Sequence, residues 1–245
     1  MQDLVKVHKK GIKIAALVAF ATIEAAIYVV IHTADSRYFP PFAYASVVLA
    51  FAFSFLSLAY GAQRIGWFVR AGLLFTLGAD LCLVVLIPAR ELAGVCLFIP
   101  AQLLYGAYVA CTIGKGRVNT AHVITRAVAS LLGIVLPLIV LGSRADLLSV
   151  VSVFYYAQLV VNLVFSFFSR NLRVFSVGLV LFALCDLSIG LSELARGYLG
   201  ADPGSILYTI THTGVNLAWV FYLPSQVLIS ASLLTVGGKN GKENL

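Results

Sequence analysis

Eight long apolar runs constrain the fold of this chain more than any other feature of its sequence. They cover approximately residues 13–32, 42–60, 66–88, 92–113, 119–142, 147–168, 171–192 and 206–235. Each is about as long as the roughly 20 residues that an α-helix needs to cross a bilayer. Strands are not expected, because the apolar residues are continuous and do not alternate with polar ones. The sequence therefore predicts an all-α integral membrane protein in which residues 1–245 form a single domain of eight transmembrane helices.

The basic residues are divided unevenly between the two sets of alternating loops. Of the 17 Lys and Arg residues, 13 lie in the set that includes both termini, and only Arg37, Arg90, Arg144 and Arg196 lie in the other. Since Lys and Arg in short loops favour the cytoplasmic side, we expect both termini in the cytoplasm. The net charge of +7 then reflects topology. It forms no basic stripe of the kind that binds nucleic acid.

Two segments of the chain resemble each other. Residues 72–81 and 178–187 both consist of Gly-Leu, six further residues and Asp-Leu. The two copies lie four predicted helices apart, in the third and the seventh, so matching helices would cross the membrane in the same direction. This spacing favours two parallel four-helix halves.

Three acidic residues fall within the predicted spans, namely Glu24, Asp80 and Asp186. An ionisable side chain costs at least about 2.5–3.5 kcal/mol at the bilayer centre, which makes it a candidate functional residue. Asp80 and Asp186 each precede an outer-loop arginine by ten residues, or about 15 Å along a helix. The two aspartates are therefore expected at equal depth. Glu24 lies at a comparable depth, where it either joins the same cavity or bonds a polar side chain of a neighbouring helix.

Further polar side chains are expected at a similar depth in the fourth, sixth and eighth spans. They are Gln102, Tyr105, Tyr155, Tyr156, Gln158, Asn162, His212, Asn216, Tyr222 and Gln226. Taken singly, each is typical of a hydrogen bond between membrane helices. Together they indicate a polar chamber that binds a substrate.

Two carboxyl groups that share a site of low dielectric constant are not both ionised, because desolvation and mutual repulsion disfavour the second charge. One group then donates a proton while the other accepts one. This division suits general acid–base hydrolysis and equally suits proton-coupled transport. A retinal Schiff base is excluded, since no run contains a lysine beyond Lys13 at its boundary. The scattered histidines form no HExxH motif, so we expect neither a metal nor another cofactor.

Four segments resemble, in their order and spacing, those of the lysoplasmalogenase (YhhN) family. They are residues 72–80 (GLLFTLGAD), 98–105 (FIPAQLLY), 181–186 (LFALCD) and 221–232 (FYLPSQVLISAS). The resemblance implies an eight-helix membrane hydrolase that cleaves the vinyl ether bond of lysoplasmalogens, a class of lysophospholipid, with Asp80 and Asp186 as its functional acids. The chain departs from the family pattern at Gln102, where a His is usual, and at Arg37, Pro40 and Pro41, where the family has Lys-Pro.

Other functions stay open. An intramembrane aspartyl protease also uses two acids on two helices, but this chain has Gly78-Ala79-Asp80 in place of GxGD and lacks a Pro-Ala-Leu motif. A proton-coupled transporter, or a sensor of a small or lipidic ligand, suits the parallel repeat. In a purely structural membrane protein the acids would have no chemical role.

Overall fold

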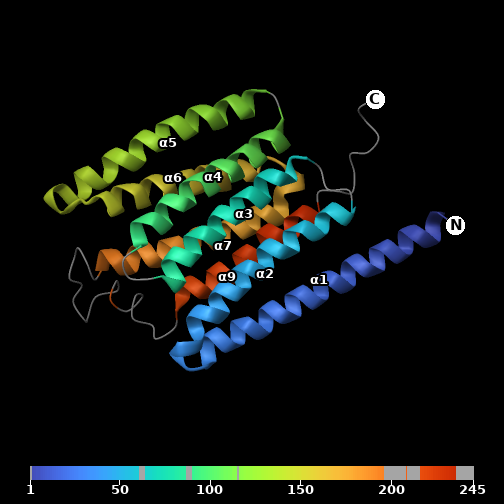
Figure 1. Cartoon of the computed structure of the whole chain (residues 1–245). Helices are drawn as coiled ribbons and strands as arrows, with labels where there is room; N and C mark the ends of the chain where they lie inside the picture. The colour runs from blue at the N-terminus through green and yellow to red at the C-terminus, as the bar shows by residue number, and fades with distance from the viewer. Residues whose placement is uncertain are drawn as a thin grey trace.

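The computed structural model describes residues 2–60, 64–86, 90–114, 116–195, 208 and 216–235, with side chains from residue 11 onward. These residues are helical almost throughout and contain no strand. Figure 1 shows the long helices lying side by side along one common direction. The predicted all-α membrane fold is confirmed, because eight of the described helical segments are long and apolar enough to cross a bilayer.

The described elements follow one another with short connections. In chain order they are α1 (Gln2–Thr33), the 3-10 helix η1 (Ser36–Tyr38), α2 (Phe39–Ser54), the 3-10 helix η2 (Phe55–Tyr60), α3 (Gly66–Asp80), the π-helical turn η3 (Leu81–Val85), α4 (Glu91–Ile113), α5 (Arg117–Leu141), the 3-10 helix η4 (Gly142–Arg144), α6 (Leu147–Ser166), the 3-10 helix η5 (Arg170–Leu172), α7 (Arg173–Glu193) and α9 (Leu217–Thr235).

Two of the predicted spans differ from the observed ones by more than four residues in length. The second was expected over residues 42–60, but helical structure begins earlier and gives a span of Ser36–Tyr60. Pro40 and Pro41 explain the early start, because they occupy the first turn of α2, where proline costs no hydrogen bond. The eighth was expected over residues 206–235. The structure describes it from Leu217, and most of residues 206–216 lie outside the described residues.

The turn between α5 and α6 defines one end of the bundle, which we call the turn end. Gly142 ends α5 with a positive φ of 55°, a conformation that glycine adopts without strain. Asp146 then begins α6, because its side chain accepts a hydrogen bond from the backbone of Ser149 while Ser149 caps in return. This capping fixes where α6 starts. In Figure 1 the turn end lies on the left, opposite the end where α1 begins.

The packing of the helices follows the internal repeat. The first half packs α3 against α4, as the second packs α7 against α9, and α4 lies against α6 as α9 lies against α2. The repeated glycines lie in these contacts. A Cβ atom on Gly72 would stand 2.3 Å from the Tyr105 ring of α4, and one on Gly178 would stand 2.8 Å from Ile229 of α9. Small residues permit such close approach of membrane helices. The two repeated glycines therefore lie in equivalent helix contacts, one in each half.

A second pair of similar segments extends the repeat into α4 and α9. Residues 98–104 read FIPAQLL and residues 222–228 read YLPSQVL. Phe98 and Tyr222 therefore take matching positions, each one turn before Gln102 or Gln226. Only Tyr222 carries a hydroxyl group, so the two halves differ chemically where they meet.

Candidate active site

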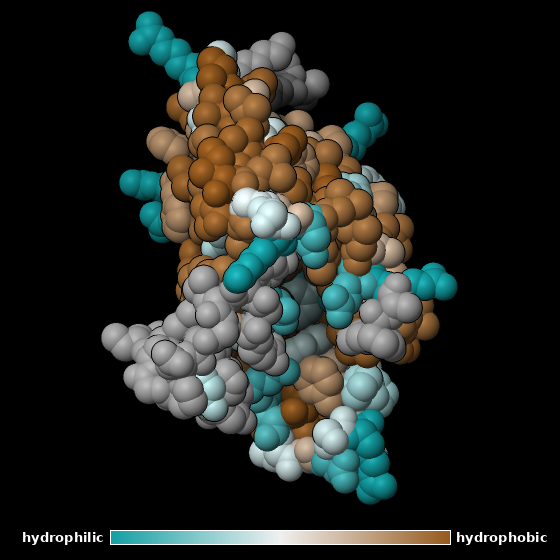
Figure 2. Space-filling view, turned by 90° about the vertical axis from the view of Figure 1, so that its left-hand side faces the viewer, coloured by the Kyte–Doolittle hydropathy of each residue, from teal (hydrophilic) through white to brown (hydrophobic). Residues whose placement is uncertain are grey.

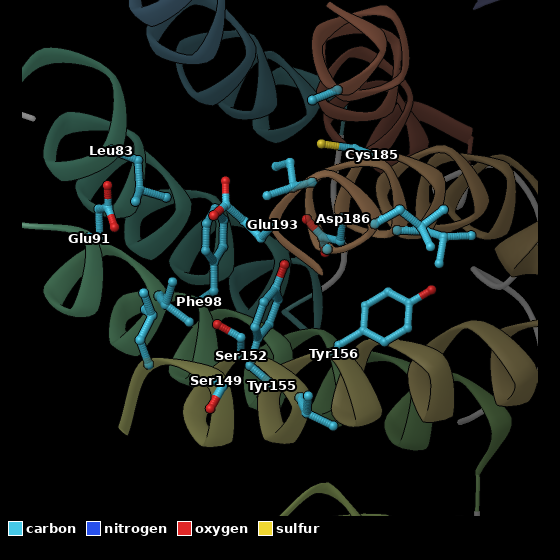
Figure 3. Close-up of a pocket in the computed structure, with 18 of the residues that line it drawn as sticks. Leu83, Glu91, Phe98, Ser149, Ser152, Tyr155, Tyr156, Cys185, Asp186 and Glu193 are labelled. Carbon is cyan, nitrogen blue, oxygen red and sulfur yellow. The ribbon is translucent and has the colours of Figure 1, made fainter. Parts of the chain in front are cut away.

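A cavity of about 650 Å³ lies between α3, α4, α6, α7 and α9, and both Asp80 and Asp186 line it. Its volume falls within the range of sites that bind small molecules. Most of the wall is apolar, with Val95, Phe98 and Leu187 among the lining residues. The polar groups are few and lie at its base and at its mouth. The two aspartates that were predicted to share one chamber therefore both line this cavity. Figure 3 shows Asp186 among its lining residues.

Asp80 is held by a neighbour from the other half of the chain. It is the last residue of α3, directly before the π-helical turn η3, and such turns occur frequently at functional sites. Its side chain is 3% exposed. The hydroxyl group of Tyr222 on α9 donates a short hydrogen bond to Oδ2 of Asp80. This bond stabilises a carboxylate on Asp80 and fixes its orientation in the cavity.

Asp186 has a less complete set of partners. It lies on α7 beside Cys185, and the hydroxyl group of Tyr155 on α6 is within hydrogen-bonding reach of its carboxyl group. Figure 3 shows the hydroxyl end of Tyr155 directed towards Asp186. Oδ2 of Asp186, in contrast, is buried and has no hydrogen-bond partner among the described residues. This oxygen remains available to a bound molecule.

The carboxyl group of Asp186 lies close enough to that of Asp80 to interact with it electrostatically. Each aspartate also interacts electrostatically with one further tyrosine. Tyr44 of α2 interacts with Asp80, and Tyr156 of α6 interacts with Asp186. An apolar wall excludes competing water, so a proton shared by such a pair can be given to a substrate and later recovered. The arrangement is suited to general acid–base chemistry.

The cavity leads towards the turn end of the bundle. Glu91 begins α4 there, Ser149 and Ser152 lie in the first turns of α6, and Glu193 ends α7. Figure 3 places Glu91 and Glu193 together on one side of the cavity. Figure 2 views the molecule from this end, and its surface is hollowed near the centre. These polar side chains surround the mouth, whereas Asp80 and Asp186 lie at the base.

Replacing Tyr222 with Phe should lower the rate of any reaction that depends on Asp80. The change removes the donor to Oδ2, and a hydrogen bond to a charged group contributes about 1.5–3 kcal/mol. If that stabilisation acts in the transition state, the expected loss in kcat is roughly 10- to 100-fold. Initial rates of the purified variant measure it. Tyr108→Phe is the matched control, because the buried Tyr108 hydroxyl has no described hydrogen-bond partner. Equal rates for wild type and Tyr222→Phe would contradict a role for this bond.

Gln102 and Asn162 were predicted to bind substrate, but the structure places them in a separate polar cluster. Asn162 donates from Nδ2 to the backbone carbonyl of Gln102 at 2.7 Å and to its Oε1 at 3.0 Å. Neither residue lines the cavity. Arg126 of α5 donates to Oδ1 of Asn162 and to Oε1 of Gln158, so the cluster extends to α5 through Asn162.

Arg126 lies deeper in the bundle than its sequence position suggested. It is one of the 13 basic residues predicted to mark the cytoplasmic side. In the structure it lies within the span Arg117–Arg144, where it contacts His122 and α6. Gly106 of α4 provides the space, since a Cβ there would stand 1.9 Å from Nη2 of Arg126. No described acidic side chain forms an ion pair with it. The cluster joins α4, α5 and α6 through neutral hydrogen-bond acceptors.

Tyr105 and Gln226, two more predicted substrate contacts, also lie outside the cavity lining. The hydroxyl group of Tyr105 is 3.4 Å from Oγ1 of Thr76, and its ring packs against Gly72. Gln226 donates to Ser225 at 3.3 Å. Both are fully buried. The contact of Tyr105 joins α4 to α3, whereas the hydrogen bond of Gln226 stays within α9.

Glu24 bonds a polar side chain of a neighbouring helix, which is the second of the two arrangements expected for it. Its carboxylate accepts a hydrogen bond of 2.6 Å from Ser46 on α2, and the side chain is 2% exposed. It is not among the residues that line the cavity. A depth equal to that of the aspartates does not bring Glu24 to the cavity, because α1 packs on the outer side of α2 and not beside α7 (Figure 1).

The last two predicted contacts precede α9. Asn216 is exposed at the start of that helix, where its carbonyl oxygen accepts hydrogen bonds from Trp219 and Val220, and it does not line the cavity. His212 lies outside the described residues. Of the predicted set, the cavity brings together Asp80, Asp186, Tyr155, Tyr156 and Tyr222.

The polar residues at the mouth were missed from the sequence. Glu91 and Glu193 fall just outside the predicted spans 92–113 and 171–192, and Ser149 and Ser152 fall within the span 147–168 with no predicted role. The only available signal was the position of the two glutamates beside the outer-loop arginines Arg90 and Arg196. Nothing in the sequence showed that these ends face one cavity.

Comparison with known proteins places the chain in a family. The model of the YhhN family matches residues 38–233, which is most of the chain and includes both aspartates. Neither the curated proteins nor the solved structures contain a match to this chain.

Proposed function

This chain belongs to the YhhN family, and on that premise we propose that it is a membrane-embedded hydrolase of lysolipids. In the proposed reaction it cleaves the vinyl ether bond of a lysoplasmalogen and releases a fatty aldehyde and a glycerophospho-alcohol. One observation supports this function above the others. Asp80 and Asp186, from the two halves of the chain, line a single cavity with largely apolar walls.

The chemistry of a vinyl ether requires two acids in different protonation states. Hydrolysis begins when an acid protonates the β-carbon of the double bond, which leaves an oxocarbenium ion at the neighbouring carbon. Water then attacks that carbon while a base removes its proton. The resulting hemiacetal breaks its carbon–oxygen bond to the glycerol, which gives the aldehyde and the alcohol. A pair of carboxyl groups can perform each proton transfer without a cofactor.

The hydrogen bonds favour one assignment of the two roles. Asp80 accepts the hydrogen bond of Tyr222, which suits the carboxylate that stabilises the oxocarbenium ion and activates the water. Asp186 has a free Oδ2, which suits the group that carries the proton and presents it to the substrate. In the breakdown of the hemiacetal intermediate, Asp186 regains a proton from the hemiacetal hydroxyl group, and Asp80 gives the proton that it took from water to the departing glycerol oxygen.

The walls of the cavity match a substrate with one hydrocarbon chain. Val95, Phe98, Val153 and Leu187 provide apolar contacts, and their burial by a chain is favourable by about 0.8 kcal/mol per methylene group when the chain comes from water. The polar mouth, with Ser149 and Glu91, provides a place for a hydrated head group. The scissile bond lies between these two parts of the lipid, as the aspartates require.

Incubation of the purified protein with a panel of lysolipids tests the proposed function. The panel contains vinyl ether, ester and alkyl ether compounds with the same head group and chain length, and mass spectrometry measures the products. We expect fatty aldehyde from the vinyl ether compound and no cleavage of the alkyl ether compound. Fatty acid from the ester compound alone would contradict the proposed chemistry. Proton-coupled uptake of a solute by reconstituted protein, with no lipid cleaved, would favour a transporter instead.

A further inference from the structure

The turn-end halves of α6 and α7 are loosely packed. No residue of α6 between Leu147 and Phe154 is buried, and none of α7 between Asp186 and Leu194 is buried. The other halves of the same helices contain many buried residues, among them Leu159, Leu179 and Phe182. The two helices therefore leave the packed core together, at the level of the aspartates.

The cavity reaches around α7 to the side that faces the membrane. Leu187 and Ile189 both line it, yet residues two positions apart point about 200° apart on an α-helix. A cavity enclosed by neighbouring helices would touch only one face of α7. Leu187 is 44% exposed and Ile189 is 48% exposed, so these apolar side chains are also part of the lipid-facing surface. The cavity is continuous with that surface.

The opening does not extend towards the other end of the bundle. There the hydroxyl group of Tyr156 on α6 donates to the carbonyl oxygen of Ala183 on α7 at 3.5 Å. Beyond this bond α7 packs closely against α9 at Gly178. The gap between α6 and α7 is thus confined to the half of the membrane that adjoins the turn end.

We propose that this gap is a lateral entrance through which a single-chain lipid passes from the adjoining leaflet to Asp80 and Asp186. The inference rests on the proposed function and adds the route and the leaflet. Given the expected orientation of the basic loops, that leaflet is the non-cytoplasmic one. The lipid chain keeps apolar surroundings as it moves from the bilayer past Ile189 and Leu187, so its entry exposes no hydrocarbon to water.

A tryptophan at position 189 tests the entrance in protein reconstituted into vesicles. Two vinyl ether substrates are compared: a long-chain lysolipid within the bilayer, and a short-chain analogue that stays dissolved below its micellar concentration. We expect Ile189→Trp to lower the rate with the long-chain lipid at least tenfold, because the larger ring narrows the gap. The dissolved analogue, which enters through the polar mouth, should lose less than threefold. Ile139→Trp is the matched control, because Ile139 is 73% exposed on α5 and does not line the cavity.

The outcomes separate the entrance from the proposed function. If wild-type protein cleaves neither substrate, the proposed function fails. If it cleaves both and Ile189→Trp leaves the long-chain rate unchanged, or lowers both rates equally, the lateral entrance is wrong. A second readout uses a lysolipid with a photoreactive group on its chain. Crosslinks to residues 147–156 and 184–194 support the entrance, and crosslinks confined to other helices overturn it.

Discussion

Asp80→Asn and Asp186→Asn should each lower the rate of vinyl ether hydrolysis by about 10²–10⁴-fold, the usual contribution of a general acid or base. Asparagine keeps the shape of the side chain but neither supplies a strong acid nor carries the negative charge that stabilises an oxocarbenium ion. The loss should appear in kcat, because the acids act on the reacting atoms and the apolar wall still binds the chain. Aldehyde release by the purified variants, measured across substrate concentrations, checks this expectation.

Glu24→Gln provides the control for those two variants. Glu24 is also a buried intramembrane acid, but it bonds Ser46 and does not line the cavity. Its variant should retain activity within about threefold, because the amide can still accept the hydrogen bond of Ser46. If Asp80→Asn and Asp186→Asn both keep full activity in folded protein, the aspartates do not perform the chemistry. If Glu24→Gln loses as much as they do, the effect belongs to intramembrane acids in general and not to the cavity.

Gly178→Leu should destabilise the protein by about 3 kcal/mol, a large value for overpacking at one site. A Cβ on Gly178 would stand 3.1 Å from the backbone nitrogen of Ile229 and 3.2 Å from the carbonyl oxygen of Ser225. Backbone atoms cannot rotate away as a side chain does, so α7 and α9 must separate. The midpoint of thermal unfolding in detergent measures the loss. Because Tyr222 lies one turn from Ser225 on α9, the separation should also weaken its bond to Asp80 and lower activity.

Gly190→Leu is the matched control, because it makes the same change on the same helix. No atom lies within 4 Å of a Cβ placed at Gly190. Its effect on the free energy of unfolding should stay within about 0.5 kcal/mol, as is usual for substitutions at open positions. A similar loss of stability in both variants would show that leucine itself is poorly tolerated in α7, and that the contact with α9 is not the cause.

Parts of the candidate site were predictable because a helix converts sequence distance into depth. The ten residues between each aspartate and an outer-loop arginine placed Asp80 and Asp186 at the same level, and the structure has them in one cavity. The repeat of Gly, Leu and Asp likewise indicated two parallel four-helix halves. Depth alone gives no direction around the bundle axis. Gln102 and Asn162 were expected in the cavity on depth, but they bond each other in a separate cluster. Glu24, for which depth left two positions open, bonds Ser46.

The sequence position of Arg126 likewise did not show which side chains surround its charge. Its position near the start of an apolar run is compatible with a loop or with the interior of a span, and the sequence does not record that Gly106 leaves room for a guanidinium group. The neutral partners Gln158 and Asn162 come from a helix more than 30 residues away. A pairing of this kind depends on which helices are neighbours.

The sequence by itself determined the eight spans, the all-α class and the depth of the two aspartates, because apolar length and helical rise are local properties of the chain. Only the tertiary structure decided that Tyr222 and Tyr155 are the partners of the aspartates, that Glu24 belongs to a separate contact, and that α6 and α7 part at one end. Those features depend on the rotation and neighbours of each helix, which arise from packing between residues far apart in the chain.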